Sequence, residues 1–168
     1  SHWDRPDRLM GLQVWVALPK EREASAPQFV HYSACSLPEL DTDGVLIRVV
    51  AGECYGARSR LATDSPLFFV DLRFAPGARL ALEADYTERA VYVVEGEITL
   101  DNQTLSEGQM AVLKPGCQPV LESGPGAMVA AVGGEPLDGP RHIWWNFVAS
   151  DRERIERAKA DWRADRFG

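Results

Sequence analysis

The chain has 168 residues, of which 45% are hydrophobic and 26% are charged, a composition typical of one globular domain with its own core. Its formal net charge of −7 argues against a general nucleic-acid-binding surface, because phosphate backbones are bound by clustered Lys and Arg. No apolar run approaches the roughly 20 residues that a membrane-spanning helix needs, and we expect no secretory signal segment.

The polar residues 1–10 are predicted to form a tail or interdomain linker. From residue 11 onward, short segments rich in β-branched and aromatic residues are separated by clusters of Gly, Pro, Asp and Asn, which is typical of an antiparallel sandwich or barrel. The predicted strands cover residues 13–17, 45–50, 67–74, 79–82, 90–94, 98–100, 110–113, 119–122, 128–132 and 143–148. We therefore expect a mostly β domain over residues 11–140, followed by a terminal strand and helix over residues 141–168.

The predicted helix begins at the end of the last strand. Ser150 and Glu153 have the spacing of a capping box, in which the hydroxyl and the carboxylate each accept a backbone N–H. Ile155, Ala158 and Trp162 then recur at i, i+3 and i+7, which gives a narrow apolar stripe. A helix this short is stabilised mainly by packing that stripe against another element.

The segment before this helix reads RHIWWNFV, residues 141–148. Taken as one strand, it presents Trp144, Asn146 and Val148 on one face and Ile143, Trp145 and Phe147 on the other. Two interpretations remain open: a strand buried between barrel and helix, or a strand with one face against another domain or subunit, where Trp and Phe are enriched. The interface candidates are Trp144, Trp145, Phe147, Ile155 and Trp162.

Residues 76–97 resemble the first metal-binding motif of cupin barrels. In that motif a Gly is followed six residues later by His-x-His, then by a Glu, and then by a Gly seven residues further on. Aligned on Gly77 and Gly96, the three ligand positions hold Glu83, Asp85 and Arg89. The second motif, residues 108–119, normally supplies a final His, and its last position holds Pro119.

These substitutions remove the chemistry that a metal needs. A mononuclear Fe, Mn, Ni or Cu site requires mostly imidazole nitrogens with one carboxylate, whereas Arg89 carries a permanent cation. We expect an ion pair of Arg89 with Glu83 or Asp85 instead, because both carboxylates are predicted to point to one face of a strand. The only histidines, His2, His31 and His142, lie outside the motif. No metal ligand is therefore assigned in this chain.

The same charged residues leave a second hypothesis open. Two carboxylates beside an arginine can act as acid, base or polar anchors when burial separates their pKa values, so Glu83, Asp85 and Arg89, with Cys54 and Cys117 nearby, are candidates for a metal-independent pocket. The alternative is a salt-bridged plug, or charges exposed in the loop of residues 83–88. The three cysteines, without CxxC spacing, favour a reducing, cytoplasmic compartment.

Several segments resemble the second half of proteins of the pirin family, and the resemblance runs from residue 11 to the end. It is carried by GLQVWVALP, AGECYG, SPLFFVDLRFAPGA, RAVYVVEGE and, most specifically, GGEPLDGPRHIWWNFVASDRERIERAKADW. Pirins are bicupins, with two jelly-roll barrels packed together. The resemblance implies a degenerate carboxy-terminal cupin barrel without a metal, and an iron site only in an amino-terminal cupin half that this sequence lacks.

Family activity includes iron-dependent oxygenolysis of flavonols such as quercetin and regulatory binding to other proteins. The resemblance therefore implies that this chain is a structural or protein-interaction module, and that catalysis belongs to the other half. The expected partner is that amino-terminal cupin half or a second copy in a homodimer, with a regulatory protein as a further possibility and with no direct nucleic-acid or membrane partner. The alternative is a metal-independent binder or enzyme that uses the charged pocket.

Overall fold

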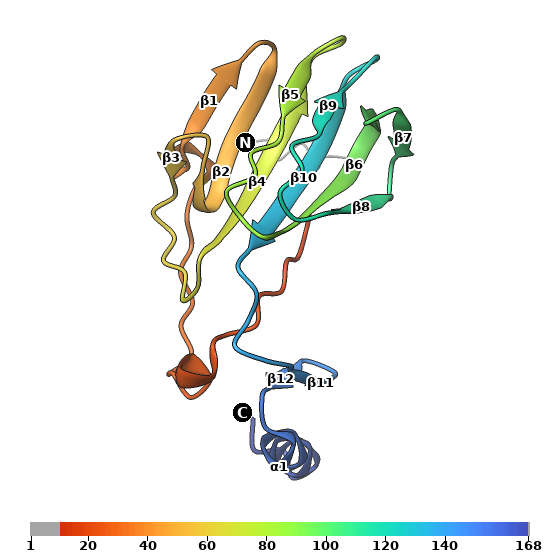
Figure 1. Ribbon diagram of the computed structural model, residues 1–168. Helices are drawn as coiled ribbons and strands as arrows, with labels where there is room; N and C mark the ends of the chain where they lie inside the picture. The colour runs from red at the N-terminus through yellow and green to blue at the C-terminus, as the bar shows by residue number, and fades with distance from the viewer. Residues whose placement is uncertain (1–10, 168) are drawn as a thin grey trace, which may run out of the picture.

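A computed structural model of the chain describes residues 11–167, which form a curled antiparallel sheet followed by a small terminal unit (Figure 1). The strands of the sheet are β1 (Glu39–Thr42), β2 (Val45–Cys54), β3 (Ala57–Arg58), β4 (Leu67–Phe74), β5 (Arg79–Ala81), β6 (Glu88–Leu100), β7 (Gln103–Ser106), β8 (Met110–Leu113), β9 (Val120–Glu122) and β10 (Ala127–Gly134). The terminal unit contains β11 (His142–Trp144), β12 (Phe147–Ala149) and α1 (Arg152–Arg163).

The long strand β6 organises the sheet. Its first part pairs with β10 and β8, and its last part pairs with β9 and β7. The strand bends at Gly96, which has a φ of 78° and whose Cβ would lie 2.6 Å from the Gly126 carbonyl oxygen. This bend lets one sheet, in the order β1-β2-β4-β10-β6-β9-β5, curl around its own apolar face.

The core lies on the concave side of the curled sheet. Strand β4 alternates strictly between buried and less buried residues, and β2 does so from Val45 to Gly52, as half-buried strands should. Buried Val, Leu and Ile side chains from β2, β4, β6, β9 and β10 meet in one cluster. The expected mostly β, cupin-type fold with one carboxy-terminal helix is confirmed.

The terminal unit lies apart from the sheet and is connected to β10 by residues 135–141, which also contact the chain's first described segment (Figure 1). That segment, residues 11–38, contains two short 3-10 turns, Lys20–Arg22 and Ala34–Ser36. Arg141 donates to the Leu18 carbonyl oxygen, and Asp138 accepts from the Lys20 backbone N–H. The unit's position is thus set largely by residues 18–23.

Two strand predictions are wrong. Residues 13–17 have no regular structure, because no strand within residues 11–167 pairs with them. Residues 143–148 are not one strand but a hairpin, in which β11 pairs with β12 across a two-residue turn at Trp145 and Asn146. Trp145 takes a φ of 48°, the left-handed conformation that such turns require. Trp144 and Phe147 therefore face each other instead of opposite sides.

Two further differences concern the continuity of strand β6 and the residue that caps helix α1. The predicted strands 90–94 and 98–100 are one strand, β6. The cap of α1 is Asp151, whose carboxylate accepts from the Glu153 backbone N–H, whereas Ser150 donates its backbone N–H and its hydroxyl to Glu23. Ser150 is thus one residue too early for the cap because it contacts the amino-terminal segment.

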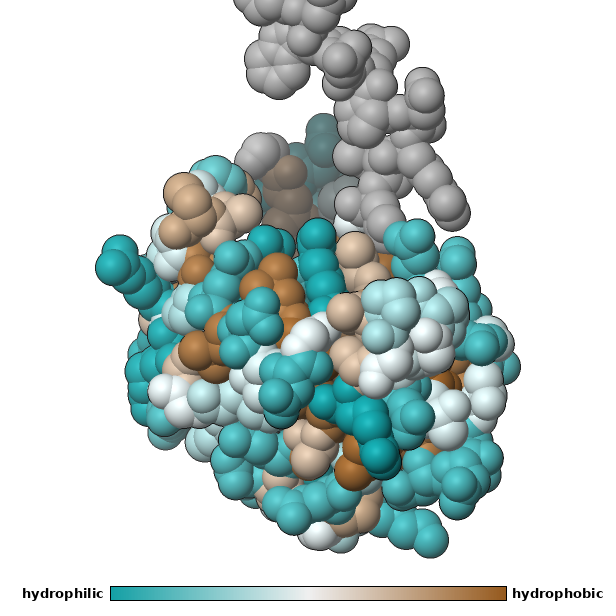
Figure 2. Space-filling model, turned by 90° about the horizontal axis from the view of Figure 1, so that it is seen from above, coloured by the Kyte–Doolittle hydropathy of each residue, from teal (hydrophilic) through white to brown (hydrophobic). Residues whose placement is uncertain are grey.

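No helix among the described residues is long and apolar enough to cross a bilayer. Hydrophilic residues dominate the end of the barrel that is remote from α1, where only small apolar areas are exposed (Figure 2). The predicted tail, residues 1–10, lies outside the described residues.

Candidate functional site

Glu83 and Asp85 do not share a strand face as predicted. Strand β5 ends at Ala81, so both acids lie in the irregular segment that leads to β6. Asp85 is exposed, while Glu83 is half-buried. The alternation that would bring the two carboxylates together is absent, because the segment has no ladder partner at these positions.

The Glu83 carboxylate binds the hairpin that joins β2 to β3. Its Oε2 accepts from the Tyr55 backbone N–H at 2.6 Å and lies 3.5 Å from the Cys54 Sγ. Burial, reinforced by the negative charge of Glu83, raises the pKa of the Cys54 thiol from 9.0 to about 12. Burial also raises the pKa of the Tyr55 phenol. Glu83 therefore closes the hairpin onto the barrel, and Cys54 is held as a neutral thiol.

Arg89 points into the barrel from the start of β6 and is only 2% exposed. Its Nη1 donates to the Glu83 carbonyl oxygen at 2.8 Å, and its Nη2 donates to the carbonyl oxygens of Cys117, at 2.7 Å, and Lys114, at 3.3 Å. The predicted ion pair with the carboxylate of Glu83 or Asp85 is not formed among the described residues. Arg89 instead joins two loops through their backbone, the segment between β5 and β6 and the segment between β8 and β9.

A transition-metal ion does not fit these residues. The guanidinium of Arg89 lies at a ligand position, the Glu83 carboxylate is already hydrogen-bonded, and Pro119 has no donor atom. Within residues 11–167, no cluster of three or more His, Cys, Asp or Glu side chains could hold a metal ion.

Four of the five candidate pocket residues form a chain of contacts and not the lining of one cavity. Cys54 touches Glu83, Glu83 touches Arg89 through its carbonyl, and Arg89 touches Cys117, with 3.7 Å between Nη2 and Sγ. Asp85 stands apart, in a cavity of about 440 Å³ that Cys54 also lines. Most of the polar atoms in this chain of contacts are bound to one another or to the backbone.

A larger hollow lies elsewhere, on the outer face of the sheet. It has a volume of about 860 Å³ and is bounded by residues 14–17 on one side and by strands β4, β6, β8 and β10 on the other. Cross-strand partners supply its floor in one row: Phe69, Val132, Ala90 and Val112. Val112, on the edge strand β8, is 80% exposed.

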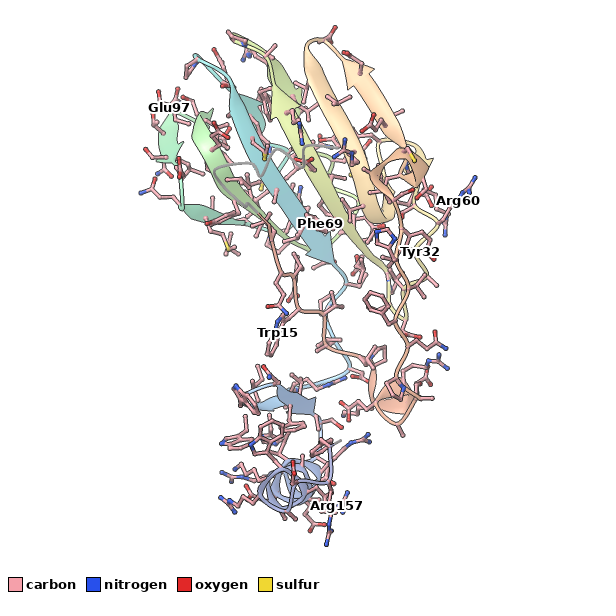
Figure 3. All side chains as sticks on the ribbon, turned by 180° about the vertical axis from the view of Figure 1, so that it is seen from behind. Trp15, Tyr32, Arg60, Phe69, Glu97 and Arg157 are labelled. Carbon is pink, nitrogen blue, oxygen red and sulfur yellow. The ribbon has the colours of Figure 1, made fainter. Side chains whose placement is uncertain are left out.

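A second hollow of about 690 Å³ continues from the first. Both are lined by Trp15, Val16, Ala17, Glu88 and Leu137, and the second extends to Ile143 and Val148 of the terminal hairpin. Trp15 lies between the sheet that carries Phe69 and the terminal unit (Figure 3). We call the two hollows together the apolar cleft. Sequence reasoning missed it, although the alternation of Leu12, Val14 and Val16 was a signal for an exposed apolar edge.

The predicted interface residues gather in the terminal unit. Trp145 and Trp162 meet edge to face at 4.4 Å, and Trp144 stacks on Phe147 at 6.0 Å. Trp145 and Trp162 remain about half exposed, at 53% and 45%, whereas Ile155 is buried. The unit therefore has a small core of its own and presents aromatic surface beside the cleft.

Comparisons with known proteins all point to one family. Residues 69–168 match the family described as the pirin C-terminal cupin domain. A pirin-like protein from Caulobacter vibrioides is 46% identical over 95% of this chain and 56% of its own length. Human pirin is 27% identical over 94% of this chain and 57% of its own length.

A solved structure, the quercetin 2,3-dioxygenase from Acinetobacter baumannii, is similar to this chain with a TM-score of 0.84 and 26% identity. The similarity covers 92% of this chain and 55% of that structure's chain. The chain thus spans about half the length of the curated relatives that it matches.

Proposed function

Since the chain belongs to the pirin family and is a pirin-like cupin domain related to quercetin 2,3-dioxygenase, we propose that it is a metal-free module whose role is structural. Its partner is an amino-terminal cupin half of the same protein or, without that half, a second copy of this chain. The three free cysteines support a reducing cytoplasmic location.

One observation carries this proposal: a buried guanidinium stands at a metal-ligand position. A metal ion there would meet the fixed positive charge of Arg89, whose donors bind the carbonyl oxygens of Glu83, Lys114 and Cys117. Removing the guanidinium would leave the carbonyl oxygens of Glu83 and Cys117 without this donor, so the arginine is integral to the barrel. This arrangement supports a structural role for the barrel interior and not a role in metal chemistry.

The exposed apolar surface supports the proposal that a partner binds this chain. The apolar cleft, the aromatic residues beside it and the edge strand β8 are continuous around Trp15. Apolar surface gathered in one place on a protein often marks an interaction site. Strand β8 pairs only with β6 among the described strands, so its outer edge is open to a partner.

Activity of the whole protein is a further part of the proposal. Iron-dependent oxygenolysis of a flavonol, or regulatory binding to another protein, would belong to the half that is absent from this sequence. That assignment rests on the relationship to quercetin 2,3-dioxygenase and on the donor set of this barrel, which does not fit iron.

Two measurements test the proposal. Metal analysis of the purified chain should give far less than one equivalent of iron, nickel, copper or manganese, and a stoichiometric metal would overturn the metal-free module. Light scattering should show a dimer or larger species, and Val112→Asp should shift it to the monomer, because an aspartate would be buried unpaired in the interface. Phe29→Asp, an equally exposed site outside the cleft, is the matched control.

A metal-independent binder is the second candidate. The outer hollow of about 860 Å³ is of the size of a small-molecule site, although the charged residues predicted for binding do not converge in it. Titration of the chain with a flavonol, followed by tryptophan fluorescence, separates the two functions. Saturable binding that Phe69→Ala abolishes would favour the binder, and no binding is expected for the structural module.

A further inference from the structure

Within residues 11–167, the positive charge of Arg89 has no carboxylate partner. No Asp or Glu among the described residues forms an ion pair with it, its partners are neutral carbonyl oxygens, and its buried Nε has no hydrogen-bond acceptor. A buried cation that lacks a counter-anion favours any group nearby that can become a stronger acceptor or carry negative charge.

The group in contact with this cation, apart from backbone, is the thiol of Cys117. The Arg89 Nη2 lies 3.7 Å from its Sγ. Cys117 follows β8 in a turn closed by its backbone N–H on the Lys114 carbonyl oxygen, and it is half-buried. The residue is thus partly exposed, while the guanidinium that contacts its sulfur is buried.

The chain's other two thiols lack this combination. Cys54 is 4% exposed and faces the Glu83 carboxylate, which disfavours negative charge on sulfur. Cys35 is exposed and lies 3.2 Å from the Ser33 hydroxyl. Partial exposure beside a cation is the environment of reactive cysteines, and only Cys117 among the described thiols contacts an arginine.

We propose that Cys117 is a site of oxidative modification, at which hydrogen peroxide converts the thiol to a sulfenic acid that the Arg89 guanidinium then holds. The sulfur attacks one peroxide oxygen, and the S–O bond forms as the O–O bond breaks. The sulfur loses two electrons and the peroxide gains them, and the released hydroxide takes the thiol proton and leaves as water. Nη2 donates to the new oxygen, which accepts more strongly than sulfur.

The test uses hydrogen peroxide on the intact chain with dimedone as the sulfenic acid trap, and mass spectrometry of peptides gives the rate at each cysteine. Cys117 should be labelled faster than Cys54. Arg89→Leu should slow labelling of Cys117 about tenfold, the effect of one charge-assisted hydrogen bond, and Arg89→Lys should restore part of the rate. Arg79→Leu, which removes an exposed arginine, should change nothing.

A second comparison avoids any dependence on the variant's folding. In wild-type chain, the native rate divided by the rate in urea should be above one at Cys117 and far below one at Cys54. A ratio at Cys117 as low as that at Cys54 would overturn the proposal. So would a folded Arg89→Leu variant that labels Cys117 at the wild-type rate.

Discussion

Glu23 and Arg141 form an ion pair with 2.8 Å between Oε1 and Nε, and both side chains are buried, at 8% and 5% exposure. The same carboxylate accepts two hydrogen bonds from Ser150, and the Glu23 carbonyl oxygen accepts one from Arg154. Residues far apart in the sequence thus meet at one acidic side chain. This joint holds the terminal unit to the amino-terminal segment.

Breaking this joint should destabilise the terminal unit selectively. Arg141→Met leaves the Glu23 carboxylate buried without its cation, which costs about 3 kcal/mol. Urea denaturation followed by tryptophan fluorescence should show an early transition, because three of the five tryptophans lie in the unit. Arg166→Met, which removes an exposed ion pair with Asp161, should change the free energy of unfolding by less than about 1 kcal/mol.

The contribution of the aromatic contacts inside the terminal unit should be measurable separately from that of the Glu23–Arg141 ion pair. Trp162→Ala removes the edge-to-face contact with Trp145 and the neighbouring contact with Phe147. We expect loss of near-UV circular dichroism and about 1–2 kcal/mol of stability, since both rings are partly exposed. Arg163→Ala, on the same helix, is the control. An unchanged near-UV spectrum for Trp162→Ala would contradict the packing of the unit.

Gly52 should be the most sensitive glycine of the sheet. Its φ is 70°, and a Cβ there would lie 1.7 Å from the Leu67 carbonyl oxygen. Gly52→Ala should therefore cost more than about 4 kcal/mol or prevent folding. Gly108 has a similar φ of 82° but open space around it, so Gly108→Ala should cost only about 1–3 kcal/mol of backbone strain. Equal losses of stability for the two variants would contradict the prediction, because they would show that backbone strain alone, without the steric clash at Gly52, sets the cost.

The Cys54 thiol should make stability fall at alkaline pH. Its pKa is 9.0 when exposed and about 12 in the fold, so between these values the unfolded chain releases a proton that the native chain keeps. The free energy of unfolding therefore decreases as pH rises from about 9 to about 12. Thermal melts at several pH values should show a shallower decline for Cys54→Ala, and parallel declines would be inconsistent with this pKa.

Local sequence signals predicted much of the fold. The apolar runs at residues 67–74 and 110–113, bounded by turn residues, gave the bounds of β4 and β8, because such runs between turn signals are typical of strands. The glycine spacing located the ligand positions, and the identity of Arg89 at one of them was enough to predict that no metal ligand stands there.

Only long-range contacts decided how those residues are used. Arg89 binds carbonyl oxygens from two loops, because the segment after β5 leaves the sheet and turns the Glu83 carboxylate toward Tyr55. Ser150 loses its predicted capping role because Glu23, 127 residues away, takes both of its donors. Sequence patterns report on neighbours along a helix or strand, whereas the partner of a buried charge is chosen by which loops the fold brings together.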